Sequence, residues 1–280
     1  MPSFYLISME IIILALFILC LRHAWRTGPE AVVQLFAGAL FGVLLELATI
    51  QQLQAYSYGT FVLMLSDVPL AIGFGWGVIM YSANLFSNAT NLPEWARPVL
   101  DGLLALNIDL AMDAVAIRLE MWDWGMGLHS QFYGVPYANF WAWFWVVVSF
   151  SAGVRWLSSR LQGHWRLLAP IGAVLIGLAG VLCTNALIVF VVPRQLYELT
   201  IGLTLGSALL LVLWQRPKFT GHPAAPPAFW VPFGFHAYFL VAGLLSGYIL
   251  DPPILLAVSM VMFSISLYLH RFVWSGRRGN

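Results

Sequence analysis

Long apolar stretches recur along the whole 280-residue chain, and short polar segments separate them. An apolar run of about 18 residues or more is long enough to cross a bilayer as a helix. The residue-by-residue alternation of a membrane β-barrel is absent. The pattern therefore predicts an all-α, polytopic transmembrane helical bundle that forms one integral membrane domain over residues 1–280. We expect about eight to nine spans, at residues 4–21, 31–50, 66–86, 98–117, 138–157, 167–192, 195–214, 229–249 and 253–271.

The first apolar run, residues 4–21, has the length of a signal peptide. It has no basic segment before it and no Ala-x-Ala-like cleavage site after it. We therefore expect this run to be retained as the first span.

The basic residues fall almost entirely on one side of a nine-span arrangement. Cytoplasmic loops of membrane proteins carry the excess of Lys and Arg. The nine-span count places the N-terminus outside and the C-terminus in the cytoplasm, and it leaves only Arg118 and Arg194 on the outer side. The eleven on the inner side, of 13 in all, are Arg22, Arg26, Arg97, Arg155, Arg160, Arg166, Arg216, Lys218, Arg271, Arg277 and Arg278.

Composition excludes several classes of protein. With 61% hydrophobic residues and a mean hydropathy of +0.84, the chain has more apolar sequence than a soluble core can bury. A formal net charge of +1 gives no basic field, so nucleic acid is not an expected partner. Cys20 and Cys183 both fall in apolar spans without metal-ligand spacing, which argues against a disulfide framework and against a zinc site.

Acidic residues are concentrated between residues 107 and 144 of a chain that is only 9% charged. At 100° per residue, Asp109, Asp113 and Glu120 fall within a sector of roughly 40°, provided that the helix continues through Glu120. An acidic stripe on a membrane helix must face protein or water instead of lipid. Together with Asp123, which follows in the next loop, these acids are the first candidates for chemistry. Under the expected topology they lie toward the outer face, so the site should open outward or sideways.

A further acid approaches this cluster from another span. Glu46 lies about four residues from the end of the second span and should point into the bundle, because lipid cannot solvate its charge. Carboxyls that are close together in an apolar site can share a proton and act as a general acid. The structural alternative is that Asp109 and Asp113 are neutralised by Arg118 or by hydrogen bonds from Tyr and Trp side chains.

The outer loop and the following span contain further polar and aromatic candidates. Tyr133, Tyr137 and Asn139 surround a Gly-Val-Pro turn and could orient a water or a substrate head group. His129 is a possible proton relay, although a lone loop histidine is more often an ordinary surface residue. The tryptophans at positions 141, 143 and 145 are interpreted as part of an aromatic belt at the membrane interface.

Glycine and proline positions predict packing and connection. The glycines of the sixth and seventh spans should allow close helix packing; they are Gly172, Gly177, Gly180, Gly202 and Gly206. The proline-rich stretch from Pro217 to Pro232 is typical of an irregular cytoplasmic connector.

Two motifs resemble the membrane hydratase family of carotenoid biosynthesis, of the carotenoid 1,2-hydratase or bisanhydrobacterioruberin hydratase type. They are DLAMDAVAIRLEMWDW, residues 109–124, and FYGVPYANFWAWF, residues 132–144. Supporting matches are Glu46, the Tyr-Ser-Tyr of residues 56–58 and the segment 68–76. Ala114 stands where that family often has proline, and Ala142 where it usually has glycine. The resemblance covers residues 46–144, and the later part of the chain adds only hydrophobicity.

The resemblance implies hydration of a terminal isoprene double bond without a cofactor or a metal. An acid protonates one alkene carbon, and water adds to the resulting tertiary carbocation. The expected catalytic residues are Asp109, Asp113, Glu46 and Asp123, and the expected substrate-binding residues are Tyr58, Trp76, Glu120, Trp122, Trp124, Tyr133 and Asn139. The expected partners are a lipophilic carotenoid or isoprenoid, water and membrane lipid. The expected location is the cytoplasmic membrane of a prokaryote.

Three other functions fit part of the pattern. The spacing of Asn107, Asp109 and Asp113 resembles half of a magnesium-diphosphate site of an intramembrane prenyltransferase, but no second acidic motif follows. The acids could instead form a proton or cation pathway in a transporter, although Pro69, Pro170 and Pro232 fall near span ends. A carotenoid-binding or scaffold role would make the acids purely structural.

Overall fold

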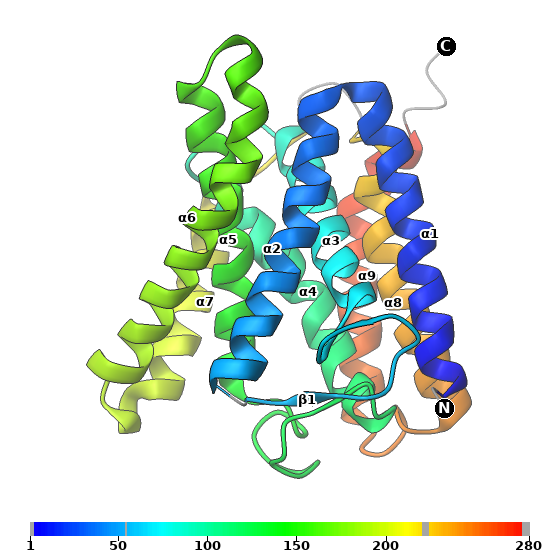
Figure 1. Cartoon of the computed structure of the whole chain (residues 1–280). Helices are drawn as coiled ribbons and strands as arrows, with labels where there is room; N and C mark the ends of the chain where they lie inside the picture. The colour runs from blue at the N-terminus through cyan, green and yellow to red at the C-terminus, as the bar shows by residue number, and fades with distance from the viewer. Residues whose placement is uncertain (1–2, 54, 220–223, 276–280) are drawn as a thin grey trace.

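Nine long helices run back and forth along one axis and account for most of the computed structural model (Figure 1), which describes residues 3–53, 55–219 and 224–275. Each of the nine expected spans overlaps one helix, so the all-α prediction is confirmed. The helices are α1 (Phe4–Thr27), α2 (Pro29–Leu53), α3 (Leu70–Asn88), α4 (Arg97–Arg118), α5 (Tyr137–Arg160), α6 (Leu168–Ala186), α7 (Tyr197–Trp214), α8 (Pro226–Ser246) and α9 (Ile254–Ser275).

Short elements connect these helices. Two antiparallel pairs of two-residue strands lie in the loops at one end of the bundle. The strands are β1 (Ser57–Tyr58), β2 (Met64–Leu65), β3 (Val68–Pro69) and β4 (Trp122–Asp123), with β1 paired to β4 and β2 to β3. The helical turns are η1 (Gly163–Leu167), η2 (Leu187–Val191) and η3 (Arg194–Leu196).

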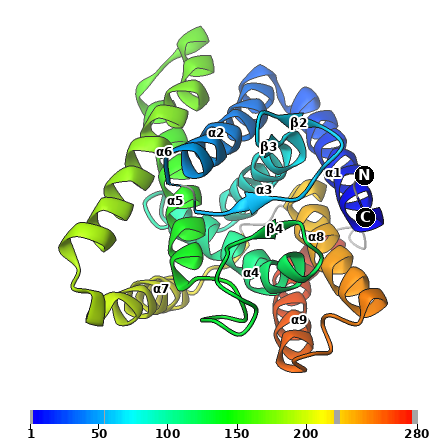
Figure 2. The same ribbon diagram turned by 60° about the horizontal axis from the view of Figure 1, so that its bottom comes forward.

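Helix α4 is an interior helix of the bundle. Within the described ranges, eight helical segments are long and apolar enough to cross a membrane, and they are built on the other eight helices. Helix α4 differs because it carries three aspartates and two arginines. It packs against α3, α5, α7, α8 and α9, and the end-on view in Figure 2 shows these helices around it. The surrounding helices therefore keep the charges of α4 away from lipid.

Helices α2 and α3 approach closely at glycines. A Cβ added to Gly42 would lie 2.5 Å from the Cβ atom of Trp76, and one added to Gly77 would lie 3.0 Å from the backbone of Leu35 and Ala39. Small residues at helix crossings let two backbones come together in this way. The contact fixes Trp76 on the inner face of α3.

The glycine prediction is confirmed for α6 and wrong for α7. A Cβ added to Gly172, Gly177 or Gly180 would lie within 3 Å of a side chain on α2 or α5. At Gly202 and Gly206 of α7 an added Cβ would meet nothing within 4 Å. Only three residues of α7, Ile201, Ala208 and Val212, are buried, because this helix stands away from its neighbours.

The loops before α3 and after α4 are joined over one end of the bundle. Ser57 pairs with Asp123 and Tyr58 with Trp122, and the Gly59 amide donates to the Met121 carbonyl at 2.9 Å. The Val62 and Leu63 amides donate to the Glu10 carboxylate of α1 at 3.0–3.2 Å. The joined loops form a cover over the end of the bundle where Asp109 and Asp113 lie.

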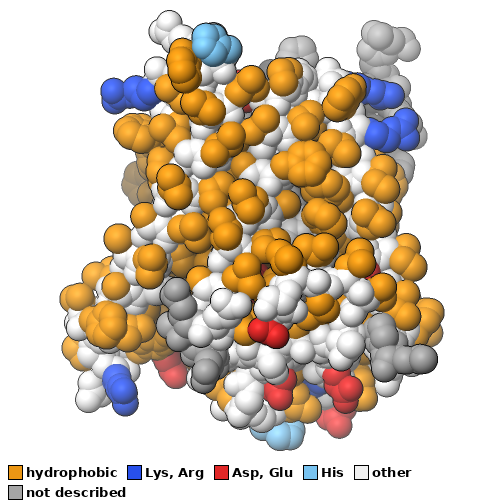
Figure 3. All heavy atoms as spheres, in the orientation of Figure 1, with side chains coloured by type: hydrophobic (Ala, Val, Ile, Leu, Met, Phe, Trp, Pro, Cys, Tyr) orange, Lys and Arg blue, Asp and Glu red, His pale blue; other side chains and the backbone are white. Residues whose placement is uncertain are grey.

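The two ends of the molecule differ in charge. In Figure 3, Lys and Arg gather mainly at the end that holds the α1–α2 turn, and Asp and Glu gather at the opposite, loop-covered end. At the basic end Arg155 pairs with Asp101 at 3.2 Å and also donates to Ser87 and Asn88. By the excess of Lys and Arg in cytoplasmic loops, this distribution predicts that the basic end faces the cytoplasm.

The proline-rich connector is shorter than expected. Helix α8 begins at Pro226, with two prolines in its first turn, and Pro232 lies inside the helix instead of in a loop. Proline fits the first turn because the amides there have no helical partner. In the described part of the connector, residues 216–219 and 224–225 are not helical, and residues 220–223 lie outside the described residues.

Candidate functional site

Two acids on α4 share one hydrogen-bond donor from α5. Asp109 and Asp113 lie one turn apart and are 0% and 2% exposed. The Asn139 Nδ2 atom donates to both Asp109 oxygens at 3.2 Å and to Asp113 Oδ2 at 2.6 Å. Because both carboxyls contact the same nitrogen atom, they form one buried cluster.

Glu46 of α2 is held by three donors. The Trp76 Nε1 atom donates to its Oε1 at 2.8 Å, and the Tyr58 hydroxyl donates to its Oε2 at 2.8 Å. The Tyr56 hydroxyl donates to the same Oε2 atom. Glu46 is only 4% exposed, so these bonds replace the water that the carboxyl loses.

The two tyrosines remain donors over a wide pH range. Burial raises the pKa of Tyr56 and of Tyr58 well above the ordinary value of about 10, and the nearby charge of Glu46 raises both further. Both hydroxyls therefore keep their protons at neutral pH. Their position in the loop after α2 ties this loop to the carboxyl of Glu46.

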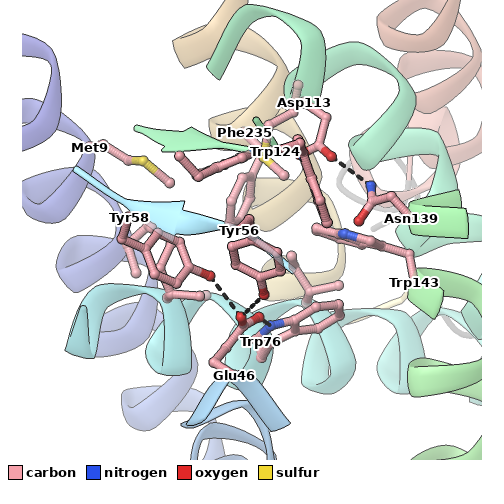
Figure 4. Close-up of a pocket in the computed structure, with 16 residues that line it drawn as sticks. Met9, Glu46, Tyr56, Tyr58, Trp76, Asp113, Trp124, Asn139, Trp143 and Phe235 are labelled. Atoms are coloured by element: carbon pink, nitrogen blue, oxygen red, sulfur yellow. Dashed lines mark hydrogen bonds between the residues drawn. The ribbon is translucent and has the colours of Figure 1, made fainter. Parts of the chain in front are cut away.

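Glu46 and Asp113 line one pocket with an empty volume of about 490 Å³. Figure 4 shows Asp113 and Asn139 at one side, Glu46 at the other, and the rings of Tyr56, Trp124 and Trp143 between them. Trp76 and Trp143 lie 4.4 Å apart between ring centroids, as do Tyr56 and Trp124. The full lining is Met9, Ile13, Glu46, Tyr56, Tyr58, Ile72, Gly75, Trp76, Ile79, Met112, Asp113, Trp122, Trp124, Asn139, Trp143 and Phe235.

Of the eleven residues expected to be catalytic or substrate-binding, seven line this pocket. Asp109 lies directly behind it and accepts a hydrogen bond from Asn139. The expected stripe through Glu120 is wrong, because α4 ends at Arg118 and Glu120 is exposed with a φ of 59°. Asp123 is exposed and accepts a hydrogen bond from the Gly125 amide at 2.8 Å. Tyr133 also lies outside the pocket.

Arg118 does not neutralise the acid pair. Its guanidinium donates to the carbonyls of Ala114, Tyr133 and Leu128 at 2.8, 2.9 and 3.3 Å. It thus ties the outer loop to the end of α4. The structural alternative that relied on Arg118 is not supported by these contacts.

The aromatic-belt interpretation is wrong for two of its three tryptophans. Trp141 is 2% exposed, and Trp143 lines the pocket against Trp76. Trp143 follows Asn139 by one helical turn, so the helical period alone could have placed it beside the acids. Met9 and Phe235, which also line the pocket, carry no such signal because they come from distant helices. His129 is exposed in the outer loop.

A metal-binding cluster is not found in the part of the chain that the structure describes. There, no group of three or more His, Cys, Asp or Glu side chains lies close enough together to hold an ion. Cys20 is buried and Cys183 is exposed, and both are free thiols.

Together, the fold and the site define an integral membrane protein with acids buried in an aromatic pocket. The chain belongs to the carotenoid biosynthesis protein family, whose model matches residues 3–212. The match reaches beyond the expected 46–144 and contains every pocket residue except Phe235. Curated proteins and solved structures give no match to this chain. The family indicates a biosynthetic enzyme with a carotenoid substrate.

Proposed function

We propose that this protein adds water to the terminal isoprene double bond of a carotenoid without a cofactor and gives a tertiary alcohol. The observation that carries the proposal is the placement of Asp113 and Glu46 on one aromatic pocket. Protonation of an unactivated alkene needs an acid that is positioned beside hydrocarbon, out of bulk water. The family supplies the substrate class, and the pocket supports the reaction.

Asp113 is the proposed proton donor because it lines the pocket, whereas Asp109 lies behind it. Its proton passes to the less substituted alkene carbon, and the π electron pair forms the new C–H bond. The tertiary carbon becomes the cation. Asn139 and Asp109 are positioning residues: the Asn139 amide donates to the Asp113 carboxylate after it has lost the proton, and Asp109 accepts from the same amide and so fixes its orientation.

The aromatic rings are suited to the positive charge that develops. A cation above the face of an indole or phenol ring is attracted by the ring quadrupole. Trp76, Trp124, Trp143 and Tyr56 all line the pocket between the two acids. They surround the cation with polarizable faces and leave few nucleophiles in its path.

Glu46 is the proposed base for the water. As the water oxygen bonds to the tertiary carbon, the Glu46 carboxylate accepts the released proton, and the proton returns to Asp113 before the next turnover. The buried Trp124 Nε1 atom has no hydrogen-bond partner among the described residues, which leaves one donor beside the pocket for that water. Trp76 and Tyr58 position Glu46, and Trp122 contributes pocket wall.

The test is expression in cells that accumulate an acyclic carotenoid such as lycopene. We expect the extracted pigment to gain the mass of one water, with oxygen-18 from labelled water in the new hydroxyl. Asp113→Asn and Glu46→Gln should lower turnover at least about a hundredfold, because each removes one proton-transfer group. Asp109→Asn should lower turnover less.

Glu120→Gln is the matched control, because it makes the same carboxyl-to-amide change at an exposed position of the same segment. It should leave turnover within about twofold. Unaltered hydration in Asp113→Asn would remove Asp113 from the mechanism. A folded wild-type protein that gives no hydrated pigment would contradict the proposal, and proton flux would then be measured to test the transporter alternative.

A further inference from the structure

A second, larger cavity lies away from the acids, between α4, α7 and α9. Its empty volume is about 2510 Å³. Leu, Val, Ile, Met and Phe side chains make up most of the wall, and no acidic residue is among the described residues that line it. We name it the α7 groove; it is lined by Phe86, Thr90, Leu100, Leu103, Leu104, Leu106, Asn107, Leu110, Leu205, Gly206, Leu209, Val212, Leu213, Pro217, Lys218, Phe219, Met262, Ile265, Tyr268, Leu269 and Arg271.

The α7 groove has the length of one leaflet. Along α4 it runs from Leu100 to Leu110, and the ten rises between these residues cover about 15 Å at 1.5 Å per residue. The hydrocarbon core of a bilayer is about 30 Å thick, so the groove spans about half of it. A molecule that fills the groove is therefore one leaflet long.

The charges of the α7 groove lie at a single end. Lys218 and Arg271 line it at the basic end of the bundle, and the Arg271 guanidinium lies 3.6 Å from the centroid of the Tyr268 ring. Deeper in the groove, Asn107 is already bonded to the Met262 carbonyl and to His236 Nε2. The wall is thus apolar within the membrane and cationic at head-group depth.

Helix α7 has few packing contacts with the rest of the bundle, and the α7 groove lies beside it. Only three of its residues are buried, and Gly206 opens directly onto the groove with no atom within 4 Å of an added Cβ. A void beside a helix forfeits the dispersion contacts that would hold the helix. Acyl chains in the groove would restore them.

We propose that the α7 groove binds one anionic phospholipid of the cytoplasmic leaflet. Its acyl chains lie along α4, α7 and α9, and its phosphate lies beside Lys218 and Arg271. An acyclic carotenoid fits less well, because a neutral hydrocarbon gains nothing from two cations and is too long for one leaflet. The bound lipid attaches α7 to the rest of the bundle.

The experiment uses the full chain in nanodiscs that contain equal amounts of phosphatidylglycerol and phosphatidylcholine. The protein is extracted in mild detergent, and the retained lipids are identified by native mass spectrometry. We expect the wild type to retain about one phosphatidylglycerol. The Lys218→Gln/Arg271→Gln variant should retain about tenfold less, because each cation near the head group contributes to binding.

Two controls match these changes. Arg26→Gln/Arg160→Gln removes two exposed cations from the same end of the bundle but outside the groove, and it should retain phosphatidylglycerol like the wild type. Gly206→Trp fills the groove and should displace the lipid whatever its head group. Gly202→Trp adds the same bulk to open space outside the groove and should not.

Other outcomes would overturn the proposal. If the wild type retained the two phospholipids equally, Lys218 and Arg271 would not select an anionic head group. The same would follow from equal retention of phosphatidylglycerol by the Lys218/Arg271 and Arg26/Arg160 variants. A carotenoid or a second copy of the chain, displaced by Gly206→Trp in place of a phospholipid, would assign the groove to that occupant.

Discussion

At the scale of single residues, the site depends on a few donors that serve more than one acceptor. Asn139 serves two aspartates, and Glu46 receives three donors from two neighbouring segments. In such a network, the loss of one donor costs more stability than the loss of one isolated hydrogen bond. The following two predictions concern these donors.

Asn139→Leu keeps the size of the side chain and removes its amide. The Asp109 and Asp113 oxygens then lose their common donor in a buried site, which should lower the free energy of unfolding by about 2 kcal/mol. Thermal unfolding in detergent measures the loss. Asn84→Leu, a control that removes a single hydrogen bond to Asn88 far from the acids, should cost about 1 kcal/mol. An unchanged melting temperature for Asn139→Leu would show that the pair does not need this donor.

The raised pKa values of Tyr56 and Tyr58 predict that the folded protein loses stability at alkaline pH. Their pKa is raised in the folded protein by burial and then by Glu46, so they stabilise the fold fully below the unfolded pKa of about 10. As the pH rises above 10, the unfolded tyrosines lose their protons first, and this stabilisation declines. The Tyr56→Phe/Tyr58→Phe variant should melt lower than the wild type at pH 8 and show a shallower decline above pH 10.

The control for that series is Tyr248→Phe, which changes an exposed tyrosine outside the site. It should follow the wild-type curve throughout. Parallel curves for the wild type and the double variant above pH 10 would contradict the role of the two hydroxyls.

At the scale of helices, the close contact between α2 and α3 determines where one wall of the pocket lies. Gly42→Ala would place a methyl group against the Cβ and ring of Trp76 and push α3 outward. The hydrogen bond from Trp76 to Glu46 would then be misaligned, and we expect turnover to fall about tenfold or more. Gly202→Ala, at an open position of α7, should leave turnover unchanged. Equal activity of the two variants would show that the position of Trp76 is not critical.

The helices were predictable from sequence because each is an apolar run of sufficient length. The ends of the helices were harder to predict. Helix α4 ends at Arg118 with no glycine or proline directly after it; Glu120 takes a φ of 59°, and the Met121 amide donates back to the Ala116 carbonyl. That termination is why Glu120 does not continue the acidic stripe. The interior place of α4 is marked in the sequence by its charged residues, which also make it the least apolar of the nine helices.

The candidate site was predictable where a polar residue interrupts an apolar run. Glu46, Asp109, Asp113 and Asn139 stand out in this way, and the structure brings them to one region. Trp143 was assigned to the interface because tryptophan is common there, although its spacing from Asn139 places it on the same helix face; only its contact with Trp76 of another helix was hidden. Contacts between distant helices leave no mark on local periodicity.

At the scale of the whole molecule, the charge distribution predicts the sidedness of the bundle. A cysteine at His129, in the exposed loop after α4, should react with a membrane-impermeant maleimide in intact cells. A cysteine at Gln162, in the exposed segment between α5 and α6, should react only after the membrane is permeabilised. Both variants are made with Cys20 and Cys183 replaced by alanine. The reverse pattern would invert the orientation.

The pocket lies at one end of the bundle, beneath the joined loops, and this position has a consequence for a substrate with two identical ends. A rod-shaped polyene in the bilayer presents only one terminus to this end of the bundle at a time. Under the proposed function, the molecule must leave after its first hydration, turn over and return before its other terminus is within reach. The reaction is then distributive: with lycopene, a singly hydrated pigment should accumulate before the doubly hydrated one appears. A doubly hydrated pigment that forms without this lag would require a second entrance.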